Sequence, residues 1–175
     1  MNEIDEFTIK SAGNGDGGAF KRVYEYYAPY VWAVIHKTTA GNESAAREIL
    51  QDVFVRVHRS LKHYKSNSSF STWLYRIAYN TSMSHLSREA KARARTVPLE
   101  NAEPARDPSD RLDARDIVRK LLAQLTPSER FLVVSREVDE LSFEELSEIT
   151  GKNQGALRTT VSRTKSKLRE MLENE

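Results

Sequence analysis

Residues 141–169, LSFEELSEITGKNQGALRTTVSRTKSKLR, constrain the fold more than any other stretch, because they carry start and stop signals for two helices joined by a tight turn. Ser142 precedes an acidic first turn, which is typical of an N-cap with negative charge at the positive end of the helix dipole. Gly151 stands where a left-handed residue ends a helix at the least cost, and Asn153 can cap the next helix. The spacing therefore predicts a helix-turn-helix.

The second of these helices has two unlike faces. Its buried stripe is predicted at Leu157, Val161 and Leu168. The opposite face carries cations and small hydroxyls, namely Arg158, Thr159, Ser162, Arg163 and Lys165. Residues 149–169 contain six Lys or Arg and no acid, whereas residues 137–148 contain six acids and no base. This segregation favours a helix that enters the major groove of DNA, and an ordinary helical hairpin with a solvated charged face is the alternative.

Two further helices are predicted just upstream. One begins near residue 109 and carries leucines and an isoleucine at helical spacing. The other covers 127–138, because Thr126 followed by a proline and then by Glu129 is the pattern of a capped helix start. Its apolar residues are Phe131, Leu132, Val134 and Val138.

Residues 96–108, TVPLENAEPARDP, interrupt the helical pattern with three prolines, several acids and no apolar periodicity. Such a stretch is too rich in proline for a helix and too polar for a core, so we expect a flexible linker. The sequence thus predicts an all-α fold with two small helical domains, 1–95 and 109–175, on either side of the linker.

Four helices are predicted in the first domain, over 2–12, 19–39, 44–61 and 70–95, with a turn at the glycine-rich residues 13–18. Most of the apolar residues of these helices repeat at helical spacing and are expected in the core. The core stripe of the second helix is Phe20, Val23/Tyr24, Tyr27, Val31 and Val34/Ile35. That of the third helix is Ile49-Leu50, Val53-Phe54, Val57 and Leu61.

The fourth helix and the loop before it combine aromatic rings with cations and amides. Phe70, Leu74, Ile77/Ala78 and Thr81 form the predicted core stripe of the helix. Other side chains point at least partly elsewhere, namely Trp73, Tyr75, Arg76, Tyr79 and Asn80. Bases of single-stranded DNA stack on aromatic rings at about 1–3 kcal/mol each, while Arg and Lys hold the backbone. The alternative, that these rings simply pack the helical bundle, stays open.

The composition excludes several function classes. Net charge is only +2, so nucleic-acid binding must come from local patches. The chain has no cysteine, which removes thiolate metal sites and suits a reducing cytoplasm. The N-terminus is acidic without the apolar core of a signal peptide, and no run is long enough to span a membrane. The four histidines do not have the spacing of a metal site, and the sequence has neither a nucleophile elbow nor a phosphate loop. We therefore expect no catalysis and no metal or cofactor.

Several motifs resemble the extracytoplasmic-function group of bacterial sigma factors, over nearly the whole chain. Residues 48–57, EILQDVFVRV, are similar to the group's D-L-x-Q-E-x-F-x-R-x-W helix, and residues 70–80, FSTWLYRIAYN, closely resemble F-x-x-W-L-x-R-I-A-x-N. In the second domain, residues 125–130 and 155–163 match L-P-x-x-x-R and G-T-V-K-S-R-L-x-R. A departure from the last motif is Thr160, which stands where the group has an arginine and removes an expected phosphate contact.

The resemblance implies a dissociable subunit that directs RNA polymerase to promoters, with core polymerase, promoter DNA and an anti-sigma factor as partners. The first domain would dock on the clamp helices of the largest polymerase subunit through Glu48, Gln51, Asp52 and Arg56. The melted −10 strand, including one unstacked base, would be held by Tyr64, Lys65, Ser66, Asn67, Ser68, Phe70, Trp73, Tyr75 and Asn80. In the second domain, the −35 bases would meet Arg158, Thr159 and Ser162, and the phosphates Arg163 and Lys165.

The linker length agrees with this reading. Thirteen extended residues reach at most about 45 Å, roughly 13 base pairs of duplex. One chain can therefore span two promoter elements. The competing hypotheses are a stand-alone helix-turn-helix regulator, which would need a sensory or dimerising first domain, and a protein-interaction adaptor, which would leave the basic helix unexplained.

Overall fold

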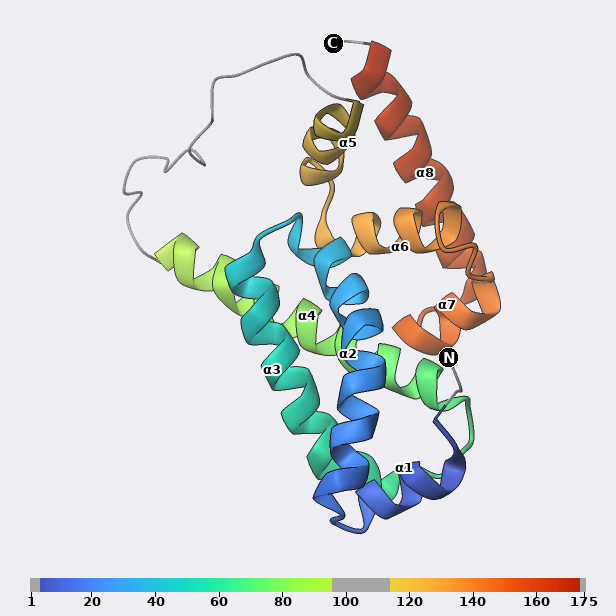
Figure 1. Ribbon diagram of the computed structural model, residues 1–175. Helices are drawn as coiled ribbons and strands as arrows, with labels where there is room; N and C mark the ends of the chain where they lie inside the picture. Colours follow the sequence, from blue (N-terminus) through green and yellow to red (C-terminus); the bar gives the residue numbers. More distant parts are fainter. Residues whose placement is uncertain (1–3, 96–113, 174–175) are drawn as a thin grey trace.

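Residues 4–95 and 114–173 form the described part of the chain in this computed structural model, and all of their regular structure is helical (Figure 1). The first domain contains α1 (Glu6–Gly13), α2 (Gly17–Thr39), α3 (Glu43–Ser60), the 3-10 turn η1 (Leu61–His63) and α4 (Phe70–Arg95). The second contains α5 (Ala114–Ala123), α6 (Pro127–Glu137), α7 (Phe143–Thr150) and α8 (Gln154–Glu173). The predicted all-α fold is confirmed, while the linker predicted at 96–108 lies outside the described residues.

Side-chain caps determine where several helices begin. At the start of α6 the Thr126 N–H donates to the Glu129 carboxylate at 2.9 Å, and the Glu129 N–H donates to the Thr126 hydroxyl at 3.3 Å. The same reciprocal pair forms at α7 between Ser142 and Glu145, with N···O distances of 2.7 and 3.1 Å. Because such signals are local, α6 and α7 begin where the sequence predicts. The first helix instead begins at Glu6, after Asp5 caps it, rather than at residue 2.

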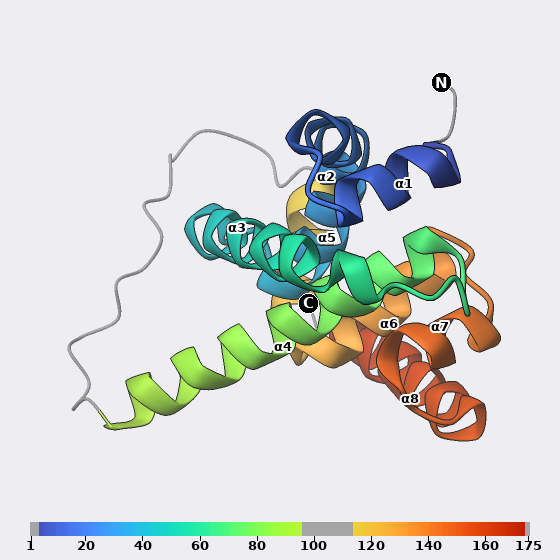
Figure 2. The ribbon, with the colours of Figure 1, turned by 90° about the horizontal axis from the view of Figure 1, so that it is seen from below.

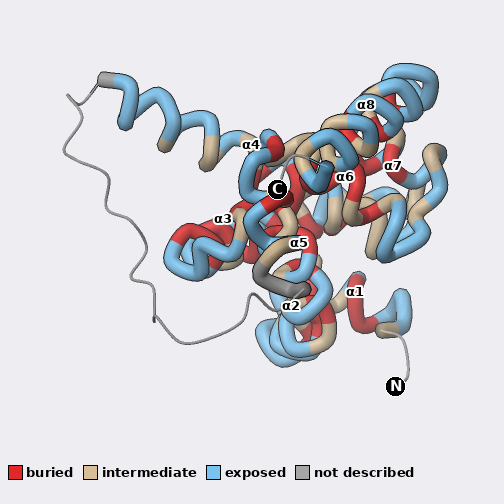
Figure 3. The backbone as a smooth tube through the Cα atoms, turned by 90° about the horizontal axis from the view of Figure 1, so that it is seen from above, coloured by how far each residue is buried: buried red, intermediate tan, exposed pale blue. Residues whose placement is uncertain are grey.

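The core of the first domain lies between α2, α3 and α4, and α1 packs against the N-terminal part of α2 (Figure 1). The predicted stripes are largely confirmed, since Val23, Val31, Ile49, Val53 and Leu74 are fully buried. The second half of α4 leaves this core and projects from the body of the molecule (Figures 2 and 3). Its residues are mostly exposed, as Figure 3 shows, so only the first half of α4 is part of the packed bundle.

The two domains pack against each other and share one continuous core. Helix α6 lies against α2, and α7 lies against α4 (Figure 1). The buried cluster of the first domain therefore continues without a break into residues of the second, including Phe131 and Ile149. At this junction the Tyr79 ring lies 4.7 Å from the Phe131 ring, and the Tyr79 hydroxyl lies 3.1 Å from that of Ser128.

Arg130 is the polar centre of the junction and is only 6% exposed. Its Nη1 donates to the Thr38 carbonyl oxygen at 2.6 Å, which ties α6 to the end of α2. Its Nε donates to the Leu122 carbonyl oxygen in the last turn of α5 at 2.7 Å, and its Nη2 donates to the Leu125 carbonyl oxygen just after that helix at 2.8 Å. One guanidinium thus satisfies backbone acceptors of both domains.

Two expectations for side chains differ from the structure. Val138, predicted in the apolar stripe of α6, is 72% exposed, whereas Val133 is buried instead. The reason is that α6 buries neighbouring faces against both α2 and α8, so its contacts do not follow one stripe. Tyr79, predicted to point away from the core of the first domain, does so but is buried by the second domain.

Candidate nucleic-acid interface

An aromatic cluster supports the loop between η1 and α4. The Tyr64 ring lies 5.3 Å from the Phe70 ring and 5.2 Å from the Trp73 ring, measured between centroids, and Phe70 also contacts Tyr27 of α2 at 5.1 Å. Phe70 is buried, while Tyr64 and Trp73 are half-buried and keep part of their rings in solvent. The structure therefore brings three predicted DNA-binding aromatics together, with Phe70 as the base of the cluster.

The loop itself is held in an unusual conformation by this cluster. The Tyr64 hydroxyl donates to the Ser68 carbonyl oxygen at 2.7 Å and closes the loop. Between them, Lys65, Ser66 and Asn67 are exposed, and Ser66 has a φ of 55°, in the left-handed region that a non-glycine residue seldom adopts. Such strain persists only where the surroundings enforce it, and it concentrates at functional segments.

Two further predicted residues of α4 lie apart from the loop. Asn80 is exposed. Tyr75 instead faces the second domain, in a cavity of about 300 Å³ between the domains that Tyr30, Asp139 and Ile149 also line. Burial raises the pKa of the Tyr75 hydroxyl, and the neighbouring Tyr30 and Asp139 raise it further. The second domain therefore covers part of the half-buried Tyr75 while the domains are packed together.

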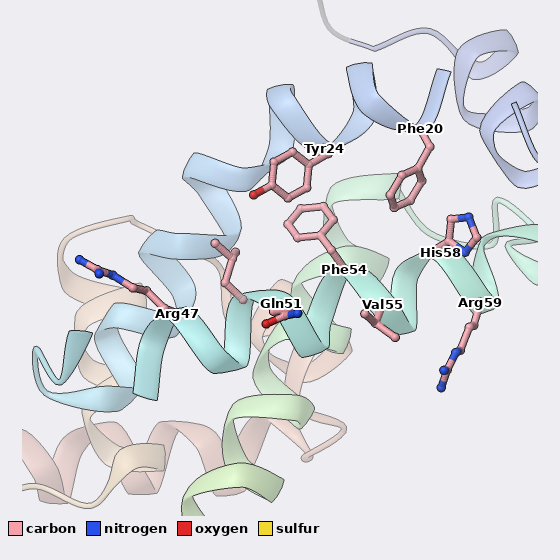
Figure 4. A pocket seen from close by; sticks show the side chains of 9 residues that line it. Phe20, Tyr24, Arg47, Gln51, Phe54, Val55, His58 and Arg59 are labelled. Atoms are coloured by element: carbon pink, nitrogen blue, oxygen red, sulfur yellow. The ribbon is translucent and has the colours of Figure 1, made fainter. Parts of the chain in front are cut away.

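The four predicted polymerase-binding residues of α3 are all exposed but do not share one surface. Gln51 lines a groove of about 590 Å³ between α2 and α3 (Figure 4). Asp52 lies in a second depression with His85 and Arg88 of α4, and Glu48 lies 3.9 Å from His85 on the same side. Arg56, the fourth residue, lines neither of these depressions.

The groove in Figure 4 contains apolar residues that the sequence reading did not assign to a site. Phe20 and Tyr24 of α2 and Phe54 of α3 turn toward one another across it, and Arg47 and Arg59 stand at its two ends (Figure 4). Tyr24 is 41% exposed, and Val55, which also lines the groove, is 43% exposed. The signal that could have revealed this groove is Val55 itself, an apolar residue on the face of α3 opposite its core stripe.

The helix-turn-helix forms as predicted and leaves one face of α8 exposed. Leu146, Ile149, Leu157 and Val161 are buried between α7 and α8, and Gly151, with a φ of 71°, ends α7. Of the five residues of α8 that were predicted to bind −35 DNA, four are exposed. The fifth, Lys165, is half-buried and pairs with Glu137 at 2.8 Å. The exposed four are Arg158, Thr159, Ser162 and Arg163.

Arg158 has an environment that the sequence did not indicate. Its guanidinium carbon lies over the Phe143 ring of α7, 5.0 Å from the centroid, and the guanidinium carbon of Arg136 lies at the same distance from that ring. No periodicity links these residues, because they belong to three different helices.

No described helix is long and apolar enough to cross a membrane.

Comparisons with known proteins match both domains. The family model "Sigma-70 region 2" matches residues 23–92, and "Sigma-70, region 4" matches residues 115–168. The chain is 26% identical to the ECF RNA polymerase sigma factor SigW of Bacillus subtilis, over 94% of each protein. It is also 26% identical to the ECF RNA polymerase sigma-E factor of Escherichia coli K12, over 98% of this chain and 93% of that one.

Solved structures share the fold at lower identity. CnrH, in complex with the cytosolic domain of CnrY, superposes with a TM-score of 0.67 at 19% identity, over 99% of both chains. The sigma factor RpoE of Bartonella quintana, in complex with the anti-sigma factor NepR, gives a TM-score of 0.69 at 21% identity, over 88% of this chain and 96% of that one. These likenesses support the all-α arrangement described above.

Proposed function

Because this chain belongs to the extracytoplasmic-function group of the sigma-70 family and directs promoter-specific initiation by RNA polymerase, we propose that its domains divide the work as follows. Residues 1–95 bind core polymerase and the melted −10 strand, 109–175 read the −35 element, and 96–108 connect them. The observation that carries this division is the contrast between the half-buried aromatic cluster at Tyr64 and the exposed basic face of α8.

The polymerase-binding surface is the exposed face of α3. Gln51 provides an amide beside the apolar groove of Figure 4, and Glu48 and Asp52 provide carboxylates on the adjoining side. A groove with an aromatic floor and polar rim is the usual form of a protein-binding hot spot. The groove therefore takes apolar side chains of a polymerase helix, while Arg56 and the carboxylates fix its register.

The −10 element is held at the loop between η1 and α4. Tyr64 and Trp73 offer partly exposed rings on the rigid base that Phe70 provides, and Asn67 offers an exposed amide. Such a platform suits a base that has already left the stack, because every base can stack on a ring and few structural changes are needed on binding.

Packing of the two domains is the state of the free factor. In this arrangement the second domain covers part of Tyr75, so the full single-strand surface forms only after the domains separate. Binding to polymerase would supply the free energy for that separation. An anti-sigma factor, such as NepR in the RpoE complex of Bartonella quintana, would be a partner of this chain as well.

Transcription in vitro tests the assignment. Core polymerase with the protein should initiate at a specific promoter, and core alone should not. Asp52→Arg should weaken binding to core at least about tenfold, since it puts a cation where a carboxylate is required, whereas Glu25→Arg on exposed α2 should not. Unchanged core affinity of Asp52→Arg, or tight sequence-specific duplex binding without polymerase, would favour a stand-alone regulator.

A further inference from the structure

A cavity of about 300 Å³ lies between the two domains, and each domain supplies half of its lining residues. Tyr30 of α2 and Tyr75 of α4 line it from the first domain, and Phe131 of α6 and Ile149 of α7 line it from the second. Protein interiors contain few voids larger than a water molecule, whereas this one has room for about ten waters at about 30 Å³ each. Ligand pockets begin at about this size and are frequent at domain interfaces. The junction therefore leaves room for a small molecule.

The walls of the cavity are mainly apolar, and its charged residues pair with each other. Phe131 and Ile149 are almost fully buried and form its inner wall, and the two tyrosine rings extend the aromatic lining. Lys37 of α2 forms an ion pair with Asp139, which follows α6, so the two charges are already compensated. A charged ligand would have to leave water without gaining a free counter-charge, which is unfavourable. The cavity therefore fits an uncharged ligand with an aromatic surface.

Ser135 of α6 places a hydroxyl group at the inner wall. It lines the cavity and is fully buried, yet its Oγ has no hydrogen-bond partner among the described residues. A serine inside a helix often donates to the carbonyl four residues earlier, as the fully buried Ser82 does to Ala78 at 2.9 Å. A buried hydroxyl without a partner costs free energy. A ligand with a hydroxyl group of its own would supply the partner that Ser135 lacks.

We propose that this cavity binds a small uncharged aromatic compound whose ring lies among Tyr30, Tyr75 and Phe131 and whose hydroxyl group bonds to Ser135. Because such a ligand contacts both domains, it binds the packed form and not the separated form. It therefore opposes separation of the domains by mass action. On the proposed function, on which this consequence rests, the ligand competes with core polymerase for the free factor.

Phenol, toluene and benzoate are matched probes, because each has one aromatic ring and they differ in its substituent. A chemical-shift titration of the full chain should show saturable binding of phenol at one site. Toluene, which lacks the hydroxyl, should bind about tenfold more weakly. Benzoate should also bind at least about tenfold more weakly than phenol, because its charge must be desolvated.

Ala33→Phe tests the location of the site. Ala33 is an exposed residue of α2 in the lining, so a phenylalanine there fills part of the cavity without replacing a core residue. Phenol binding should weaken at least about tenfold, because the added ring takes the place of the ligand. Ala90→Phe, at an exposed alanine in the projecting half of α4, is the matched control and should bind phenol as the native chain does.

Ser135→Ala separates ligand binding from stability. Alanine removes the unpaired hydroxyl and little volume, so the melting temperature should not fall. The affinity for phenol should fall about tenfold, to that for toluene, while the affinity for toluene should stay native. A merely structural role of Ser135 would instead lower the melting temperature and weaken both probes alike.

Binding to core polymerase tests the consequence for the domains. With phenol at ten times its dissociation constant, the apparent affinity of the native chain for core should fall about tenfold. In Ala33→Phe, phenol should leave that affinity unchanged.

Three outcomes would overturn the proposal. Phenol would show no saturable binding to the native chain, or it would bind Ala33→Phe as tightly as the native chain. Alternatively, phenol would bind the native chain without lowering its affinity for core. A chain that binds phenol at Ser135 but does not bind core even without phenol would instead overturn the proposed function and leave the ligand site in place.

Discussion

The two surfaces that we propose bind DNA are built in opposite ways. The loop at Tyr64 depends on contacts between residues distant in sequence, since Phe70 packs on Tyr27 of α2 and supports the rings above it. The helix-turn-helix depends on neighbours, since Ser142 and Glu145 cap α7 and Asn153 caps α8. The first surface is half-buried and rigid, and the second is exposed. On the proposed assignment, the difference indicates that melting uses a preformed platform, while groove reading uses a correctly oriented helix.

The sharpest test of this comparison removes the platform but not the helix. Tyr64→Ala combined with Asn67→Ala should abolish strand opening, by about a hundredfold or more, because stacking and the edge hydrogen bonds are lost together. Binding of the holoenzyme to closed promoter duplex should remain nearly native, because α8 is unchanged. Permanganate footprinting of unpaired thymines measures the opening. Normal opening in this variant would mean that the loop is only a connector.

Arg130→Met tests the long-range contact between the domains. Methionine fills similar space but leaves the carbonyls of Thr38 and Leu125 without the Arg130 donor, and the Leu122 carbonyl keeps only the Leu125 N–H. We expect the free energy of unfolding to fall by about 3 kcal/mol and the domains to separate, since several buried acceptors lose a charged donor at once. Urea denaturation measures the first effect and small-angle scattering the second. Arg22→Met, at an exposed arginine of α2, is the control.

A local cap should matter less. Ser142→Ala removes the hydroxyl that accepts the Glu145 N–H, so the free energy of unfolding should fall by about 1 kcal/mol. Urea denaturation against Ser87→Ala, an exposed serine of α4, gives the comparison. A loss as large as that of Arg130→Met would contradict the view that this half of the molecule depends on small local contributions.

The smallest expected effect is a pH dependence at Glu129. Hydrogen bonds from Thr126 lower the pKa of its carboxyl below the usual value, with a further contribution from Lys167. A carboxyl with a lowered folded-state pKa stabilises the protein at neutral pH, and this stabilisation disappears as pH falls through the folded value. Glu129→Gln should cost about 0.5 kcal/mol at neutral pH, because the site is partly exposed, and less in acid. Urea denaturation of the native protein and of Glu129→Gln, at neutral and at acid pH, measures the difference.

The same contrast explains what the sequence could predict. The starts of α6 and α7, the turn at Gly151 and the exposed face of α8 follow from residues within one or two turns of each other, so the sequence revealed them. Arg130 could not be recognised as a junction, because its partner Thr38 lies 92 positions away. The positions of Tyr75 and Tyr79 under the second domain depend likewise on packing between domains. Neighbouring residues carry no signal for such contacts.

The roles of individual side chains could be predicted only in part. Residue types at Tyr64, Trp73 and Arg158 indicated nucleic-acid chemistry, and the matched family models support that reading at the level of whole domains. The stacking of Arg136 and Arg158 on Phe143 has no sequence pattern, because three helices must meet before the contact exists. Geometry was needed to find it.

The hydrogen bond from Arg130 to Thr38 joins the two domains, and domain packing affects how partners of the two forms compete. If packing of the domains is favoured by about 2.7 kcal/mol, about one molecule in a hundred is separated at any moment, and every partner of the separated form binds about a hundredfold more weakly than its contact surface alone would allow. Partners that bind the packed form have no such loss of affinity. Arg130, by joining the domains, would thereby weaken every partner that must first separate them.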